Sequence, residues 1–424
     1  MTEITPKRYA HTLIIHFVLF SLFLPTFRSE YWHAYYQDFF ISNFIGAFII
    51  VNILSCRKLT LKPNGLPAIL LTVTLALYNA VLFYIYHTHK DRYFWKNDHF
   101  NVTLAFLLLI VLLLSRDVNN IISGRTIKWT IGSILVSNLI GLSIRVRGYS
   151  HIQMMNFIYW KVPYDESNNF FGWFSADASE YAFLLLLEMG FFIVYKKQFK
   201  NVWSYCLSQF LLIVCLILTN SATFLLAAFI LFGCQLIDYA VHKYNIPSKY
   251  VRISFPVAAA AGGFVFYLLF KNVDTFHTKY LIWKGSWKLL LDDPMGLGTT
   301  FGVANYFVEG VEPALDQAHN VFLNHMLRHS LGAGALFTLM FAILFISSIL
   351  RHPTYRTIGI WTALLIPLNM NYALQTVHLP FTLFMLYCIF FKPEENSENT
   401  KKASLENVST FDILDLDNDT IPLP

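Results

Sequence analysis

The chain has 424 residues, of which 56% are hydrophobic and only 13% charged, and its mean hydropathy is +0.49. Soluble domains carry about 25% charged residues, so this composition excludes a soluble enzyme, a disordered chain and a nucleic-acid-binding protein. The net charge of +5 is small and gains meaning only when the charges are placed along the chain.

The apolar segments predict an all-α polytopic membrane protein with about 12 transmembrane helices and two long outer loops that contain short helices. A helix needs roughly 17–25 mostly apolar residues to cross the hydrocarbon layer. The segments that approach this length lie near residues 11–27, 39–56, 66–86, 99–115, 129–144, 178–195, 203–219, 223–240, 253–270, 320–350, 358–374 and 379–391.

Loop lengths and charges divide the chain into six expected parts. Lys and Arg are more frequent in the connections on the side of the N-terminus, which predicts that both termini are cytoplasmic. The acid-rich end of the chain has no apolar run, and we expect it to be disordered. The parts are N-terminal membrane helices (1–144), a first long outer loop (145–179), central helices (180–270), a second long outer loop with the catalytic region (271–319), C-terminal helices (320–392) and the acidic tail (393–424).

The second outer loop carries basic and aromatic side chains at helical spacing. Lys279, Trp283 and Trp287 recur every four residues, which predicts one helix face, and Lys284 and Lys288 flank them. A Pro-containing and Gly-containing turn over residues 292–298 then ends this helix. Two interpretations remain open: a helix that lies on the membrane surface, or a binding surface for an anionic, sugar-bearing lipid.

The next segment gathers polar side chains at the mouth of a predicted span. On a helical wheel, Asn320, Asn324, His325, Arg328 and His329 share one broad arc. Such residues are costly there unless they line a wet cavity, and a neutral imidazole can accept a proton near pH 7. The alternative for each histidine is an interfacial residue with a satisfied hydrogen bond.

One acid lies deep in a predicted span. Glu188 belongs to the sixth predicted span, and ionisable groups at that depth are candidates for function. The sequence assigns it neither a partner nor a role.

Four stretches, in this order, resemble the bacterial O-antigen ligase and polymerase superfamily. They are Gly172-Trp173-Phe174-Ser175-Ala176 before a helix, Leu218-Thr219-Asn220-Ser221 before an apolar run, Lys279-xxx-Trp283 followed by Asp293-Pro294-Met295-Gly296-Leu297-Gly298, and Ala318-His319-Asn320 opening a helix. The likeness covers roughly residues 140–350. Ala222 and Lys279 stand where the family has Arg, and twelve residues separate His319 from Gly332 where the family usually has about ten.

This resemblance implies glycan transfer on the outer face of the membrane from an undecaprenyl-diphosphate-linked donor, without metal or cofactor. His319 is then the general base, with His325 as the alternative because of the changed spacing. The remaining implied substrate-binding residues are Arg145, Arg147, Lys279, Trp283, Asn320 and Arg328. The expected partners are the lipid bilayer, the donor, a glycan or lipid-glycan acceptor and a separate chain-length regulator, with no nucleic acid.

The leading hypothesis is a polymerase for a surface polysaccharide, such as a capsule or exopolysaccharide. A ligase that transfers a finished glycan to another acceptor is the first alternative, because it uses the same donor chemistry. A flippase or transporter is the second alternative. Polar residues gather at the outer mouth rather than along the spans, which favours the enzyme.

Overall fold

The computed structural model describes residues 65–88, 96–114, 122, 124–146, 178–219, 221–247, 250, 274–298, 306–308, 311–315, 317–371, 374 and 378–392. The predicted spans near residues 11–27, 39–56 and 253–270 lie outside this set. So do residues 147–177 of the first outer loop and the acidic tail over residues 393–424. The expectations for those segments stay predictions.

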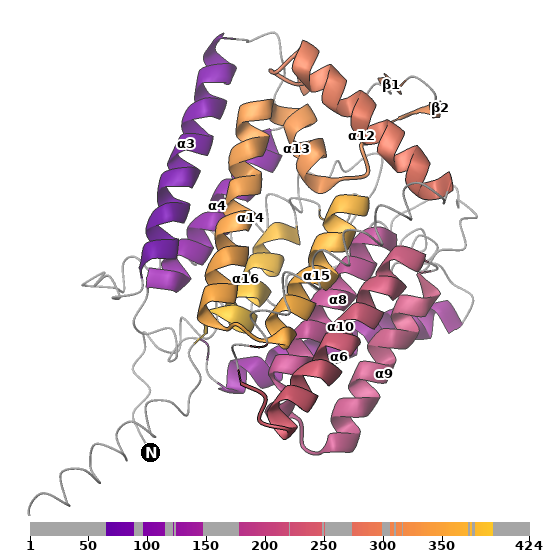
Figure 1. Cartoon of the computed structure of the whole chain (residues 1–424). Coiled ribbons are helices and arrows are strands. Elements are labelled where there is room, and N and C mark those ends of the chain that lie inside the picture. Colours follow the sequence, from indigo (N-terminus) through magenta and orange to yellow (C-terminus); the bar gives the residue numbers. More distant parts are fainter. Residues whose placement is uncertain are drawn as a thin grey trace, which may run out of the picture.

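The described chain is helical, apart from one small sheet (Figure 1). The helices are α3 (Leu66–Thr88), α4 (Lys96–Leu114), α6 (Gly124–Val146), α8 (Ala178–Val194), the short 3₁₀ helix η1 (Lys196–Gln198), α9 (Val202–Leu218), α10 (Ala222–Lys243), α12 (Asp274–Asp292), α13 (Val321–His329), α14 (Leu331–Arg351), α15 (Tyr355–Met370) and α16 (Leu379–Phe390). The antiparallel strands are β1 (Tyr306–Val308) and β2 (Val311–Leu315).

Three of the described helices, α3, α10 and α14, are long and apolar enough to cross a membrane. The predicted count of about 12 spans is therefore not supported. Several predicted spans form shorter helices, such as the 17 residues of α9 and the 12 of α16. Others are long but carry polar residues, such as Lys96, Asn97 and Asp98 at the start of α4. The helical class and the membrane association are confirmed.

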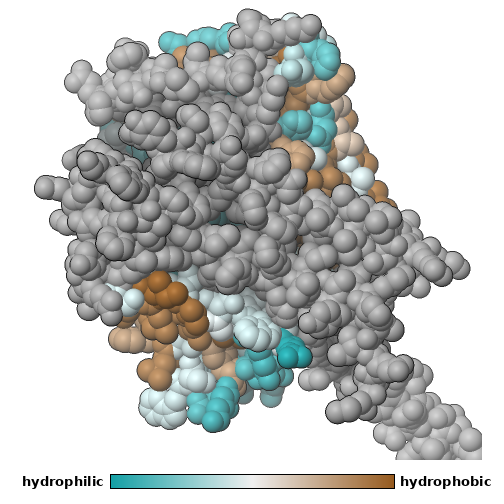
Figure 2. All heavy atoms as spheres, turned by 180° about the vertical axis from the view of Figure 1, so that it is seen from behind, coloured by the Kyte–Doolittle hydropathy of each residue, from teal (hydrophilic) through white to brown (hydrophobic). Residues whose placement is uncertain are grey.

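The spanning helices present apolar side chains at the surface. Phe83 of α3 is 65% exposed, Phe229 of α10 is 76% exposed and Leu350 of α14 is 78% exposed. Figure 2 shows brown, apolar surface at the edge of the molecule where α3 lies. Exposed large side chains in such numbers are costly in water but favourable against lipid tails. This surface supports a membrane protein.

The centre of the bundle is α8. Its residues from Glu180 to Ile193 are all buried, and it contacts α9, α10, α15 and α16. A helix that is apolar on every side belongs in the middle of a larger body. Close packing nearby depends on small residues: a Cβ at Gly359 of α15 would collide with the Cβ of Cys234 of α10, so these two helices approach closely.

The predicted span over residues 320–350 is confirmed only for its larger part, α14, because the chain breaks at Ser330. Here α13 ends and α14 begins, with Ser330 in an extended conformation between them. The Ser330 hydroxyl accepts a hydrogen bond from the backbone N–H of Ala333 at 3.0 Å, which caps α14. The Leu331 N–H donates to the carbonyl of Pro294 at 2.8 Å instead of continuing the helix.

The second outer loop also differs from expectation. The sequence predicts short helices there, whereas the described part of this loop contains the 19-residue helix α12, which ends at Asp292 as predicted, and the β1–β2 hairpin, with Tyr306 opposite Leu315 and Val308 opposite Val311. Helix α12 lies across the end of the bundle, next to α13 (Figure 1). The first outer loop begins later than predicted, since α6 continues to Val146.

Candidate functional site

The turn after α12 and the helix α13 form one packed unit. The N–H of Leu297 donates to the carbonyl of Leu327 at 2.6 Å. Gly296 has a φ of +75°, and a Cβ there would lie 2.7 Å from the same carbonyl oxygen. Only glycine suits this backbone conformation and this close approach. Two stretches that are separate in the sequence, the Pro-Met-Gly-Leu-Gly turn and the last turn of α13, are thus joined.

His319 lies in the tight bend before α13. Its φ is +48°, the left-handed conformation that few non-glycine residues adopt. Both neighbours are fixed: the N–H of Ala318 donates to Oδ1 of Asn324 at 2.6 Å, and Asn320 caps α13 by accepting from the N–H of Leu323 at 3.0 Å. The His319 side chain is half-buried. The backbone therefore holds this residue in one defined position.

The end of α15 is a shared anchor for two predicted site residues. Nζ of Lys279 donates to the carbonyl of Met370 at 2.7 Å and to Oδ1 of Asn371 at 3.0 Å. Nδ2 of Asn320 donates to the carbonyl of Asn369 at 3.3 Å and to its Oδ1 at 3.2 Å. Lys279 and Asn320, the residue after His319, are therefore both held by the three consecutive residues 369–371 at the end of α15. A cation also suits the C-terminal end of a helix.

Burial changes the protonation of Lys279. The side chain is half-buried, and the loss of hydration lowers its pKa from 10.5 to about 8. The amine therefore carries its positive charge at neutral pH and loses it in mildly alkaline solution. Two of its three hydrogens point at α15, so it can offer one more donor to an anion.

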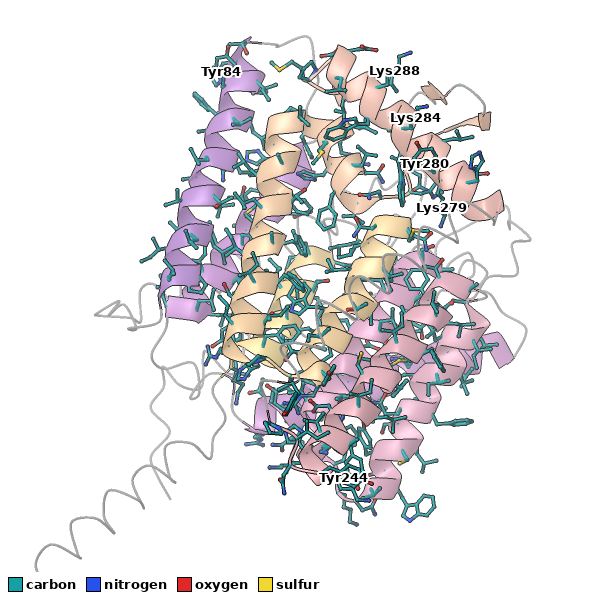
Figure 3. The ribbon with its side chains drawn as sticks, viewed as in Figure 1. Tyr84, Tyr244, Lys279, Tyr280, Lys284 and Lys288 are labelled. Atoms are coloured by element: carbon teal, nitrogen blue, oxygen red, sulfur yellow. The ribbon has the colours of Figure 1, made fainter. Side chains whose placement is uncertain are left out.

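The predicted single face of α12 is divided between two sides. Trp283 is half-buried and packs on the small apolar cluster that joins α12 to α13. Trp287 is 45% exposed, and Lys284 and Lys288, which Figure 3 labels on α12, are also exposed. A spacing of four residues turns about 40° per step around a helix of 3.6 residues per turn. Over eight residues this drift moves Trp287 away from Lys279.

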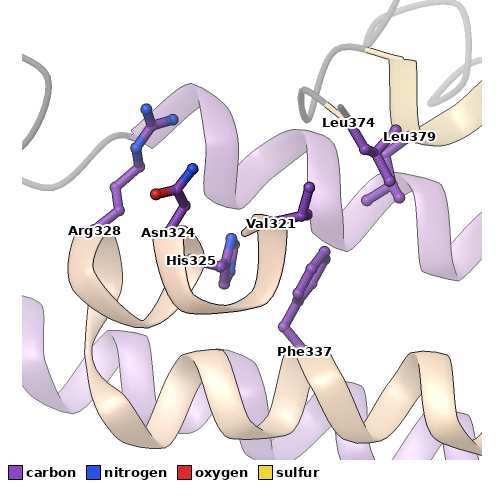
Figure 4. A pocket seen from close by; sticks show the side chains of 7 residues that line it. All are labelled: Val321, Asn324, His325, Arg328, Phe337, Leu374 and Leu379. Atoms are coloured by element: carbon purple, nitrogen blue, oxygen red, sulfur yellow. The ribbon is translucent and has the colours of Figure 1, made fainter. Parts of the chain in front are cut away.

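The polar arc of α13 faces a much smaller cavity than predicted. Figure 4 shows Asn324, His325 and Arg328 pointing to the same side of the helix, above Phe337 of α14. The volume is about 10 Å³, room for about one water molecule. The cavity is lined by Val321, Asn324, His325, Arg328, Phe337, Leu374 and Leu379. His329 is fully buried, so among the described residues the polar arc lies against a small cavity and the predicted wet cavity stays a prediction.

His325 is bound to the N-terminal part of the chain. Its Nε2 lies 3.0 Å from the hydroxyl of Tyr78 in α3, and its ring stacks on Phe337 with centroids 4.2 Å apart. The ring of His99 in α4 lies 6.0 Å from that of Tyr78. No role was predicted for the first third of the chain. The polar pair Tyr78-Asn79 inside an apolar run was the signal that could have found this contact.

Glu188 has partners that the sequence did not name. Nδ2 of Asn138 in α6 donates to Oε2 of Glu188 at 3.0 Å, and the hydroxyl of Tyr181 donates to Oδ1 of Asn138. In the first turn of α8, Oε1 of Glu180 lies 3.2 Å from Nε2 of His378. Buried polar groups thus form two small networks along the central helix.

The remaining predicted site residues are only partly covered. Arg145 belongs to the last turn of α6, but its side chain and the whole of Arg147 lie outside the described residues. Arg328 is half-buried at the small cavity. Within the described ranges, no group of three or more His, Cys, Asp or Glu side chains is arranged to hold a metal ion.

The comparisons with known proteins give no family. No protein-family model matches the chain, and no curated protein matches it either. The composition and the fold therefore define the class, a helical membrane protein, and the side chains at the α12–α13 end define the site.

Proposed function

We propose that the protein is a membrane glycosyltransferase that polymerises undecaprenyl-diphosphate-linked oligosaccharide repeat units on the outer face of the bacterial plasma membrane. The observation that carries the proposal is the shared anchor at the end of α15. It holds Lys279 on Met370 and Asn371, and it holds Asn320, the residue directly after His319, on the adjacent Asn369. A base and a cation held together are what transfer from a diphosphate donor requires.

In the proposed reaction His319 takes the proton from an acceptor hydroxyl. The hydroxyl oxygen forms a bond to the anomeric carbon while the bond from that carbon to the diphosphate oxygen breaks, so the anomeric centre inverts. The leaving diphosphate takes the electron pair, and its charge is met by Lys279 and Arg328, together with Arg145 and Arg147. No metal takes part. His325 is the alternative base, although its Nε2 is engaged by Tyr78.

The fold proposed with this activity has about 12 spans, with both termini cytoplasmic and α12 and α13 outside. The spans beyond α3, α10 and α14 then include shorter helices that are enclosed by the others. A bilayer, a lipid-linked donor and acceptor, and a chain-length regulator are the proposed partners. Ligation to a different acceptor is the alternative, since it needs the same base and the same diphosphate contacts.

The test is polymerisation by the purified protein in detergent with a chelator and one undecaprenyl-diphosphate-linked repeat unit. Wild type and His277→Ala, a control at an exposed position of α12, are expected to produce a ladder of longer glycans. His319→Ala is expected to abolish it. A ladder that persists in His319→Ala but disappears in His325→Ala moves the base to His325.

Two outcomes contradict a polymerase. Donor consumption only after addition of a second acceptor identifies a ligase. No release of undecaprenyl diphosphate with any acceptor, while the lipid-linked donor crosses the bilayer of proteoliposomes, identifies a flippase.

A further inference from the structure

A second cavity lies far from the α12–α13 site. It has a volume of about 330 Å³ and lies between the last turn of α10 and the first turn of α15. Figure 3 places Tyr244, directly after α10, at the end of the molecule opposite Lys284 and Lys288. The lining residues are Asp238, Val241, His242, Asn245, Ile246, Pro353, Thr354 and Tyr355. Its size suits a small ligand or a lipid headgroup.

The cavity contains a buried carboxylate with weak contacts. Asp238 is only 7% exposed. Within the described part of the chain, the polar contacts of its carboxylate oxygens are long. The N–H of Arg356 lies 3.5 Å from Oδ1, and Nδ1 of His242 lies 3.8 Å from Oδ2. That imidazole nitrogen is closer to the backbone carbonyl of Asp238, at 2.7 Å. A buried carboxylate accepts several hydrogen bonds and is stabilised by a positive donor.

The surroundings place this carboxylate at the depth of lipid headgroups. Helix α10 is one of the candidate spans, and the cavity is at its end. Leu236 is 69% exposed, and Tyr239 and Tyr244 are 60% and 70% exposed. Nζ of Lys243 lies 6.0 Å and 5.8 Å from the centres of those two tyrosine rings. Exposed tyrosines with a lysine are typical of the boundary between hydrocarbon and headgroups.

We propose that this cavity binds the headgroup of an ammonium-bearing phospholipid. The ammonium donates to the Asp238 carboxylate, and the acyl chains lie along exposed apolar side chains of α10. A purely anionic headgroup would bring its charge next to Asp238 without a compensating donor. A choline headgroup has no N–H group to donate. The proposal is independent of the glycosyltransferase activity.

The experiment measures lipid retention by native mass spectrometry of the delipidated protein. The probes are phosphatidylethanolamine, phosphatidylcholine and phosphatidylglycerol at equal concentration. Wild type is expected to retain phosphatidylethanolamine at least about tenfold better than the other two, since a hydrogen bond to a charged group contributes that much. Asp238→Asn is expected to lose the preference, and Asp292→Asn, at the exposed end of α12, is expected to keep it.

A second variant keeps the test valid if Asp238→Asn fails to fold. Val241→Trp narrows the cavity at a half-buried lining position and is expected to weaken retention of phosphatidylethanolamine several-fold. Equal retention of the three lipids by wild type overturns the proposal, as does an unchanged preference in either variant. Equally tight binding of soluble glycerophosphoethanolamine also overturns it, because the ligand would then be a free amine rather than a membrane lipid.

Discussion

The hydroxyl of Tyr78 and Nε2 of His325 lie 3.0 Å apart, although 247 residues separate them in the chain. Both side chains are buried, and the contact joins the spanning helix α3 to the short polar helix α13. The N-terminal helices are therefore part of the support of the candidate site.

Removal of this hydroxyl is expected to destabilise the protein. Tyr78→Phe leaves a buried imidazole nitrogen without this partner, which costs about 1–3 kcal/mol of unfolding free energy. The measurement is thermal unfolding in detergent. Tyr84→Phe is the control, because Tyr84 lies on the same helix and is 62% exposed (Figure 3). Equal melting temperatures for the two variants would show that the Tyr78–His325 contact contributes no stability.

A methyl group at Gly296 is expected to separate the turn after α12 from α13. Ala at this position meets the Leu327 carbonyl and requires a positive φ, at a cost of roughly 1–3 kcal/mol. Loss of glycan polymerisation should accompany the lower thermal stability. Gly233→Ala in α10 is the matched control, since a methyl group there would have no neighbouring atom within 4 Å. A Gly296→Ala variant as stable as Gly233→Ala would contradict the close packing described above.

Donor binding is expected to weaken as the pH rises through about 8, the lowered pKa of Lys279. Below that pH the amine is protonated and attracts the diphosphate; above it the amine is neutral, and the KM for the lipid-linked donor increases. Lys279→Arg keeps its charge throughout this range and is expected to show a flat profile. The measurement is KM against pH from about 6.5 to about 9.5 for both proteins, a range that brackets the lowered pKa. Parallel curves would exclude Lys279 as a contact of the donor.

Asn138 is expected to be essential for the stability of the central helix. Asn138→Leu removes the partner of both Glu188 and Tyr181, which costs about 2–4 kcal/mol for two buried hydrogen bonds. Ser143→Ala changes an exposed residue of the same helix and should be neutral. Chemical unfolding followed by tryptophan fluorescence measures the difference. Restored stability in the double variant Asn138→Leu, Glu188→Leu would confirm that the unpaired carboxyl causes the loss.

Composition and hydropathy were sufficient to predict a helical membrane protein, because a long run of apolar residues indicates a helix that is surrounded by lipid or by other apolar side chains. Within the described residues, fewer helices than predicted are long and apolar enough to cross a membrane, because some apolar runs form shorter buried helices such as α16. The break at Ser330 escaped prediction for a related reason. No proline or glycine marks a helix end between residues 320 and 331, and the interruption involves the distant Pro294 carbonyl.

The site was predictable where local chemistry determines it. Asn320 at a helix start and the Gly296 turn follow from capping and turn preferences. The anchoring of Lys279 on Met370 and the contact of Tyr78 with His325 depend on chain segments 91 and 247 residues apart. No spacing rule reaches that far. The division of the α12 face was missed because side chains at repeated four-residue steps drift around the helix.

The joint between α13 and α14 consists of the single residue Ser330. Insertion or deletion of one residue at this joint would displace the start of α14 relative to the polar helix before it, and the hydrogen bond from Leu331 to the Pro294 carbonyl would be lost. The length of the connection between α13 and α14 is therefore fixed at one residue, whereas the loops of this protein can become longer or shorter during evolution. Among natural variants of this chain, insertions and deletions are expected to avoid this position.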